Sequence, residues 1–226
     1  MKIELEKNVQ DVVNLISEKL GKENIFLVGG FVRDKLRNKE SKDIDFAVSL
    51  DPETVKRAFP YGYASPFGTV SFKLNGFSIT LASRRKENGY QDYRHPGNLI
   101  FVNTIEEDFK RRDFTINSLY ANTDGEIIDP SRRGLRDIHK HRLVRIGSPK
   151  KRLEEDPLRI LRTYRFSKER NLKITHRLRH ARRKTRGLII NLKKTKIKEE
   201  VNKCPAEYQK EMIKLLNLDF AYTKGE

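Results

Sequence analysis

Hydrophobic and polar positions along the first part of the chain alternate between helical and strand-like spacing. Apolar residues in the range 9–20 recur every three or four positions, which predicts an amphipathic helix. The run IFLV at 25–28 and the alternating run DIDFAV at 43–48 are typical of strands. Further along, GTVSFKL and FSITLA predict a hairpin that turns at Asn75-Gly76. A mixed α/β domain is therefore expected here.

The pattern becomes helical near residue 135. Apolar residues in the run EEDPLRILRTYRFSKE recur at mostly helical spacing, with Phe166 off the main face: Leu158, Ile160, Leu161 and Tyr164. We therefore predict two domains, an α/β head in residues 1–135 and an all-α neck with a basic end in residues 136–226. A chain of 226 residues can bury one sizeable core with a smaller helical extension.

Charge and composition narrow the class of partner. Lys and Arg number 48 and Asp and Glu 31, so the formal net charge is +17 and nucleic acid is the first partner to consider, before an anionic membrane. No apolar run has the length of a membrane span, and the N-terminal residues lack the apolar core of a signal peptide. We expect a cytoplasmic protein with no obligate protein partner. With Cys204 as its single cysteine, the chain can form no intrachain disulfide.

The strongest charge asymmetry lies in residues 170–198, which contain twelve Lys or Arg and no Asp or Glu. Most runs of like charge are solvated helices or disordered arms. Here the cations are interspersed with leucine and isoleucine, which favours a folded surface that faces phosphate. The candidate RNA-binding residues are Arg177, Arg179, Arg182 and Arg183.

Two carboxylates stand one residue apart at the start of a predicted strand. Because side chains alternate faces along a strand, Asp43 and Asp45 point the same way, while Ile44 and Phe46 enter the core. Paired carboxylates repel unless a cation lies between them, and oxygen ligands of this kind suit Mg²⁺. Taken alone, the motif could be no more than a solvated strand end.

The preceding glycines favour a functional interpretation. Gly29 and Gly30 follow one predicted strand and precede a predicted helix, where backbone N–H groups can receive a triphosphate, and Arg33 adds a cation one turn later. Two adjacent glycines are weak evidence by themselves. Followed by Arg33 and the carboxylate pair in this order, they are much more specific.

Three segments, LVGGFVRD…KDIDFAVS, KRRDFTINSLYANTDGEIIDP and EEDPLRILRTYRF, closely resemble the signature segments of class II tRNA nucleotidyltransferases, the CCA-adding enzymes, and of bacterial poly(A) polymerases. The resemblance covers residues 25 to 172. It implies a polymerase-β-like nucleotidyltransferase palm with a mixed sheet, and template-independent addition of C and A nucleotides to tRNA 3′ ends from CTP and ATP. It also implies two Mg²⁺ ions, held by the catalytic residues Asp43 and Asp45. Nucleotide contacts are implied for Gly29, Gly30, Arg33, Arg112, Asp113, Asn117, Asp156, Arg159, Arg162 and Arg165, with Asp113 and Asn117 in the segment associated with the ribose.

Base choice without a template requires the protein to distinguish hydrogen-bonding edges. Cytosine and adenine each present an amino donor beside a ring-nitrogen acceptor, whereas uracil and guanine present the reverse. Asp156 and Arg159, three residues apart on one helix face, could therefore accept C and A and reject U and G. Asp156 precedes Pro157, so it could also be a helix N-cap, and both roles are compatible.

One further segment and one residue bear on which nucleotides the enzyme adds and how it holds the metal. Residues 84–102 resemble the family's flexible loop, which favours an enzyme that can add the terminal A. Thr80 stands where relatives carry a glutamate, so the metal site rests on two carboxylates. The alternatives are A addition alone, poly(A) synthesis, a non-catalytic RNA-binding protein with this head, and transfer to a protein or small molecule.

Overall fold

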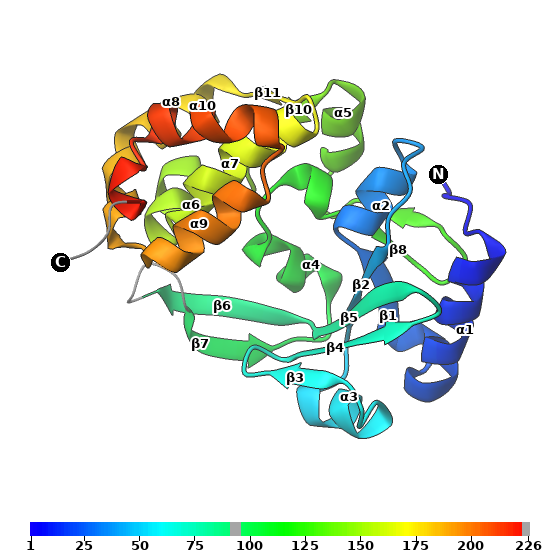
Figure 1. Cartoon of the computed structure of the whole chain (residues 1–226). Coiled ribbons are helices and arrows are strands. Elements are labelled where there is room, and N and C mark those ends of the chain that lie inside the picture. The colour runs from blue at the N-terminus through cyan, green and yellow to red at the C-terminus, as the bar shows by residue number, and fades with distance from the viewer. Residues whose placement is uncertain (91–95, 223–226) are drawn as a thin grey trace. The chain divides into compact units, whose positions relative to one another are not determined.

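The computed structural model of the chain describes residues 1–90 and 96–222 (Figure 1). Contacts between residues divide the chain into two compact units. The first comprises residues 1–87 and 99–138, and the second comprises residues 88–98 and 139–226. No helix in the described ranges combines the length and the apolar character needed to cross a membrane.

The first unit is built on a seven-stranded sheet in the order β3-β4-β5-β2-β1-β8-β9. The strands are β1 (Ile25–Val28), β2 (Asp43–Val48), β3 (Tyr63–Ser65), β4 (Thr69–Leu74), β5 (Phe77–Ser83), β8 (Tyr120–Ala121) and β9 (Ile127–Ile128). Strand β2 runs parallel to β5, and the other neighbouring pairs are antiparallel. The helices are α1 (Lys7–Leu20), α2 (Gly30–Lys35), α3 (Pro52–Ala58), α4 (Ile105–Asp108) and α5 (Gly134–His139), with short 3₁₀ turns η1 (Lys22–Asn24), η2 (Phe109–Arg111) and η3 (Thr115–Asn117).

The two faces of this sheet have different surroundings. Ile44 and Phe46 of β2 are fully buried in a core that includes residues of α1, α2 and α3, as the alternation predicts. On the opposite face Ala47 packs with Ile105 of α4 and with Tyr120. The β4–β5 hairpin turns at Asn75 and Gly76, whose positive φ angles of 50° and 80° match the predicted turn. The carboxylates of β2 thus lie on the face that the main core leaves open.

The segment 84–102 is not a loop throughout, contrary to expectation. It contains strands β6 (Arg85–Tyr90) and β7 (Pro96–Phe101), which pair as a separate two-stranded sheet. Residues 91–95, the centre of the expected flexible loop, lie outside the described residues. Gly89 and Pro96, which suggested a loop, stand within or at the start of these strands.

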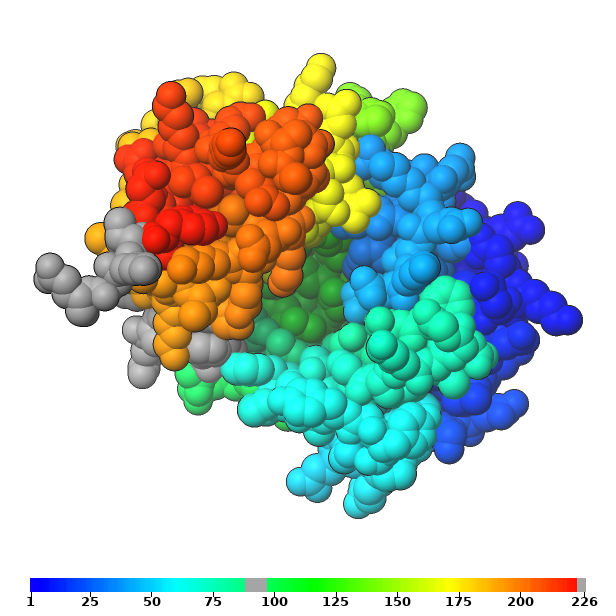
Figure 2. Space-filling model, viewed as in Figure 1, coloured from blue at the N-terminus to red at the C-terminus, as the bar shows by residue number. Residues whose placement is uncertain are grey.

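The second unit is mainly helical. Its elements are α6 (Pro149–Glu155), α7 (Leu158–Glu169), α8 (His176–Thr185), η4 (Arg186–Asn191), α9 (Lys194–Asn202), α10 (Ala206–Leu216) and η5 (Asp219–Ala221). Figures 1 and 2 show α9 and α10 side by side, in orange and red. The unit is not purely α-helical, because β10 (Arg142–Leu143) and β11 (Lys173–Ile174) form a short parallel pair. The EEDPLR segment spans two helices, since Pro157 cannot donate a backbone N–H to a continuous helix.

Candidate active site

Asp43 and Asp45 lie at the beginning of β2, on the sheet face opposite the main core. Asp43 is exposed and Asp45 is half-buried. Burial raises the pKa of Asp45 above its ordinary value; the positive charge of Arg112 partly offsets this rise, and the Asp43 carboxylate adds to it. The two carboxylates therefore share one electrostatic environment, and a cation bound between them would relieve their repulsion.

The turn before α2 passes close to this pair. Gly29 has a positive φ of 78°, and a Cβ atom added there would lie 3.4 Å from Oδ2 of Asp45. A side chain at this position would therefore be strained by its backbone, and its Cβ would be in van der Waals contact with the carboxylate. Thr80 of β5 is the register partner of Asp45, and its hydroxyl donates a hydrogen bond to that carboxylate. The position where a third carboxylate was in question thus holds a hydroxyl that orients Asp45.

Arg33, Asn117 and Asp113 form a second polar group in the same unit. The Arg33 guanidinium is buried; its Nε and Nη2 donate to the two carboxylate oxygens of Asp34 at 3.0 and 2.8 Å, and its Nη1 donates to Oδ1 of Asn117 at 2.5 Å. The Asn117 amide in turn donates to Oδ1 of Asp113 at 3.2 Å. These contacts fix the three predicted nucleotide-binding residues relative to one another, and direct contact between Arg33 and a nucleotide stays a prediction.

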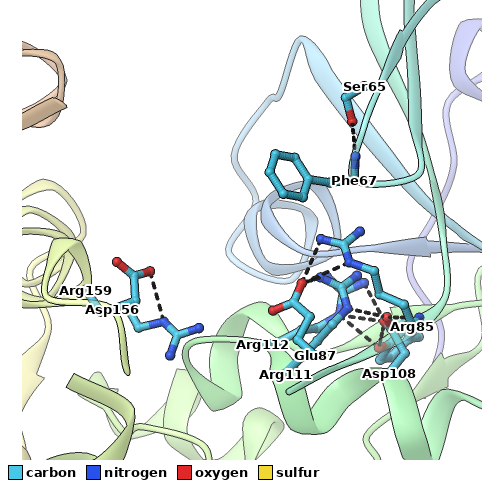
Figure 3. Close-up of polar contacts among 10 residues, drawn as sticks. Ser65, Phe67, Arg85, Glu87, Asp108, Arg111, Arg112, Asp156 and Arg159 are labelled. Carbon is cyan, nitrogen blue, oxygen red and sulfur yellow. Dashed lines mark hydrogen bonds and ion pairs between the residues drawn. The ribbon is translucent and has the colours of Figure 1, made fainter. Parts of the chain in front are cut away.

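Arg112 is anchored by two residues that the sequence patterns did not single out. Its Nε and Nη2 donate to Oδ2 of Asp108 at 3.1 and 2.8 Å (Figure 3). Its Nε also donates to the Tyr120 hydroxyl at 2.9 Å. The Tyr120 hydroxyl donates to the same Oδ2 at 2.6 Å. The available signal in the sequence was the spacing of Asp108, four residues before Arg112 in EEDFKRR.

The second unit holds the proposed base-selecting pair. Nε of Arg159 lies 3.3 Å from Oδ2 of Asp156, and the backbone N–H of Leu158 donates to Oδ1 of Asp156 at 3.1 Å. Arg159 is buried and also donates to the backbone carbonyl of Arg152 at 3.0 Å. Asp156 thus caps the free N–H of Leu158 from one position before the N-cap of α7, which is Pro157, and this contact coexists with the predicted ion pair.

Arg162 and Arg165 have different settings on α7. The Arg162 guanidinium lies 5.7 Å from the centre of the Phe166 ring. Arg165 donates from Nε to Oε1 of the buried Glu200 in α9 at 2.6 Å, and from Nη1 to Oε2 of Glu169 at 2.8 Å. Successive helical residues are rotated by about 100°, so Arg165 points roughly 240° round the axis from Arg159. These contacts hold Arg165 in place between α7 and α9, and its contact with a nucleotide stays a prediction.

The candidate RNA-binding residues lie on one folded helix, α8. Leu178, Ala181 and Thr185 are buried along one side of it. Arg177, Arg179 and Arg183 are exposed and Arg182 is half-buried. Burial, together with the charges of Arg179 and Arg183, lowers the pKa of Arg182. In the described ranges no carboxylate forms an ion pair with any of the four arginines of α8.

A sequence profile described as the poly A polymerase head domain matches residues 25–145, more than half of the chain. The chain belongs to this family. Among curated members, the CCA-adding enzyme of Lactobacillus helveticus (strain DPC 4571) is 36% identical over 177 residues, which cover 77% of this chain and 44% of that enzyme.

Solved structures of a CCA-adding enzyme and of a tRNA nucleotidyltransferase share the fold. The Bacillus stearothermophilus CCA-adding enzyme in complex with CTP has a TM-score of 0.77 and 30% identity over 88% of this chain and 49% of that chain. A tRNA nucleotidyltransferase complexed with a primer tRNA and an incoming ATP analog has a TM-score of 0.62 and 27% identity over 90% of this chain and 55% of that chain. The predicted nucleotidyltransferase head fold is thus confirmed, and the chain spans less than half of its curated relative.

Proposed function

We propose that the chain adds C and A nucleotides to tRNA 3′ ends, without a template, from CTP and ATP with release of pyrophosphate. The observation that carries this proposal is the placement of Asp43 and Asp45 on the open sheet face, beside the Gly29 turn and within the field of Arg112. A reaction of this type needs no protein nucleophile. It needs a positioned 3′-hydroxyl, a held triphosphate and compensation of negative charge. The relatives seen with CTP, with primer tRNA and with an ATP analog support these substrates.

The residues of β2 fit a pair of Mg²⁺ ions. Both donors are carboxylates, Asp43 is open to solvent, and the missing Cβ of Gly29 leaves space beside Oδ2 of Asp45. The described residues contain no group of three or more His, Cys, Asp or Glu side chains placed to hold a metal, so the remaining ligands would be substrate phosphates and water, which Mg²⁺ commonly uses. When bound, the metal supplies charge stabilisation and a more acidic 3′-hydroxyl. Asp43 and Asp45 would hold it, and Thr80 would keep Asp45 oriented.

Selection of C and A is assigned to Asp156 and Arg159. The carboxylate would accept from the exocyclic amino group, and the guanidinium would donate to the ring nitrogen. Each carboxylate oxygen can accept more than one hydrogen bond, so capping of Leu158 does not exclude a base. The salt bridge between Asp156 and Arg159 holds the two groups in the adjacent arrangement that this recognition requires.

Asparagine at position 156 separates base selection from helix capping. Asn is as good an N-cap as Asp, so Asp156→Asn should leave the unfolding temperature close to that of the unmodified chain. It replaces one carboxylate acceptor by a donor, so discrimination against UTP and GTP should fall by about 1 to 3 kcal/mol, the cost of an unpaired polar group. Single-nucleotide incorporation with each of the four triphosphates measures this change.

Asp156→Ala and Arg159→Gln complete this comparison. Both should relax base choice, but only the alanine variant removes the bond to the Leu158 N–H. If Asp156→Ala lowers the unfolding temperature while both it and Asp156→Asn keep the normal nucleotide preference, the residue is a helix cap alone.

The activity itself is tested with three tRNA substrates, ending at the discriminator base, at C and at CC. The purified chain should incorporate C twice and then A, each only onto the correct end, when labelled CTP or ATP is supplied singly. Incorporation of A alone would indicate an A-adding enzyme, and repeated A addition would indicate poly(A) synthesis. Binding of tRNA without any incorporation would contradict the proposed catalysis and support a non-catalytic RNA-binding protein.

A further inference from the structure

Three arginines of the first unit, Arg85, Arg111 and Arg112, converge on the carboxylates of Asp108 and Glu87. Asp108 is fully buried at the C-terminal end of α4. Its Oδ2 accepts hydrogen bonds from Arg112, and its Oδ1 accepts one from Nε of Arg111 at 2.7 Å (Figure 3). Glu87 in β6 accepts from Nε of Arg85 at 2.9 Å and lies 3.5 Å from Nη1 of Arg111. Three arginines against two carboxylates leave one formal positive charge in this group.

Arg112 is the arginine of this group that also carries a predicted contact with the nucleotide. In the part of the chain that the structure describes, Arg112 uses Nε and Nη2 for Asp108 and Tyr120, and its Nη1 makes no hydrogen bond or ion pair. Its guanidinium also lies 5.0 Å from the centre of the Tyr120 ring, so both the edge and the face of this group are held. An arginine pinned in this way presents its remaining N–H groups in a fixed direction.

Asp108 stays ionised while it pairs with Arg112. Burial by itself would raise the pKa of Asp108, but the guanidinium groups of Arg112 and Arg111 and the Tyr120 hydroxyl hold it well below its usual range. Burial raises the pKa of Tyr120 far above its ordinary value, so its hydroxyl remains a donor. Arg112 therefore has a permanent anionic anchor.

We infer that Asp108 is a positioning residue, which fixes the Arg112 guanidinium so that its remaining donor group meets the phosphates of the incoming nucleotide. This inference rests on the proposed function for its ligand. Asp108 itself touches no substrate, because it is fully buried and its oxygens are directed at Arg111, Arg112 and Tyr120. Asp108 acts through Arg112 by holding this long side chain in place before the nucleotide binds. Arg112 then loses less conformational entropy on binding.

A double-mutant cycle on equilibrium CTP binding tests this coupling. Asp108→Asn and Arg112→Gln should each weaken CTP binding by about tenfold or more, the value of a hydrogen bond to a charged group. The double variant should bind CTP no more weakly than Arg112→Gln alone, because Asp108 acts only through Arg112. Binding of cytidine, which has no phosphates, should not change. Additive losses, or equal losses for cytidine, would overturn the inference.

Arg111→Gln is the matched control. It removes the side-chain partner of Oδ1 on the same carboxylate and leaves the contacts of Oδ2 with Arg112 in place, so CTP affinity should stay near that of the unmodified chain. Equal weakening by Arg111→Gln and Asp108→Asn would reduce the network to structural support. If Asp108→Asn does not fold, the cycle is run with Tyr120→Phe, which deletes one hydroxyl and keeps the ring.

Calorimetric measurement of CTP binding distinguishes a failure of this inference from a failure of the proposed reaction. An unmodified chain that binds CTP and shows the non-additive cycle, yet extends no tRNA, would contradict the proposed function and uphold the role of Asp108. An unmodified chain that binds no CTP would overturn that role.

Discussion

Asp43→Asn and Asp45→Asn are each expected to reduce transfer of both CMP and AMP by roughly a thousandfold or more, since each removes a charged metal ligand whose charge stabilisation is worth several kcal/mol. Neither change should alter packing, because both side chains lie on the open face of β2 rather than in the main core. The measurement is the single-turnover rate of labelled nucleotide incorporation at saturating CTP or ATP.

Asp51→Asn provides the matched control for this loss. Asp51 is an exposed carboxylate of the same unit that accepts from the backbone N–H of Thr54 at 2.9 Å and caps α3, a role that asparagine preserves. This variant should incorporate nucleotides at the normal rate, and all three variants should bind tRNA with normal affinity. Near-normal turnover by either the Asp43 or the Asp45 variant would remove the metal site from the proposed mechanism.

The strands and their buried faces could be predicted from the sequence because the local pattern is strong there. The alternation in DIDFAV places Ile44 and Phe46 in the core and the two carboxylates on the other face, and the structure agrees. Asn75-Gly76 similarly favours positive φ angles whatever its surroundings. In both places, local stereochemistry and burial favour the same result.

The Asp108 network could not be predicted because it depends on contacts between distant segments. Asp108 reaches Tyr120 of β8 and the backbone N–H of Arg85 in β6, and no periodicity relates these three residues. The strands β6 and β7 are hidden in the sequence for a similar reason, since Gly89 and Pro96 are poor strand formers alone and pairing between the strands overrides that preference. The ion pair of Arg165 with Glu200 is equally hidden in the sequence, because Glu200 lies 35 residues further along the chain and on another helix.

The sequence of the basic helix α8 likewise shows that the helix is positively charged but not which of its arginines face solvent. The structure buries Leu178 and Ala181 and leaves Arg177, Arg179 and Arg183 exposed, so the cations lie on a folded surface. Burial, and secondly the nearby charges of Arg179 and Arg183, lower the pKa of Arg182, and bound phosphates would compensate those charges. We therefore expect this surface to supply much of the affinity for tRNA through contacts that carry no base information.

Replacing Arg177, Arg179, Arg182 and Arg183 by glutamine should weaken tRNA binding by roughly a hundredfold or more at 0.15 M salt, if all four contact phosphates. A phosphate that the protein no longer neutralises keeps its counterions, so the slope of log affinity against log salt should flatten by about 0.7 to 0.9 for each such phosphate. The Michaelis constant for tRNA should rise far more than those for CTP and ATP, because nothing in this change alters the groups around Asp43 or Arg112.

A control variant that removes the same amount of charge tests whether this loss of tRNA affinity is specific to α8. Lys7, Lys22, Lys39 and Lys73 are exposed lysines of the first unit, and their replacement by glutamine also removes four positive charges. If attraction by net charge alone governs tRNA binding, both quadruple variants should lose equal affinity. If α8 binds phosphate directly, only the arginine variant should flatten the salt slope, because counterion release reports the number of phosphates neutralised. An unchanged slope in the arginine variant would show α8 to be a solvated helix with no part in RNA binding.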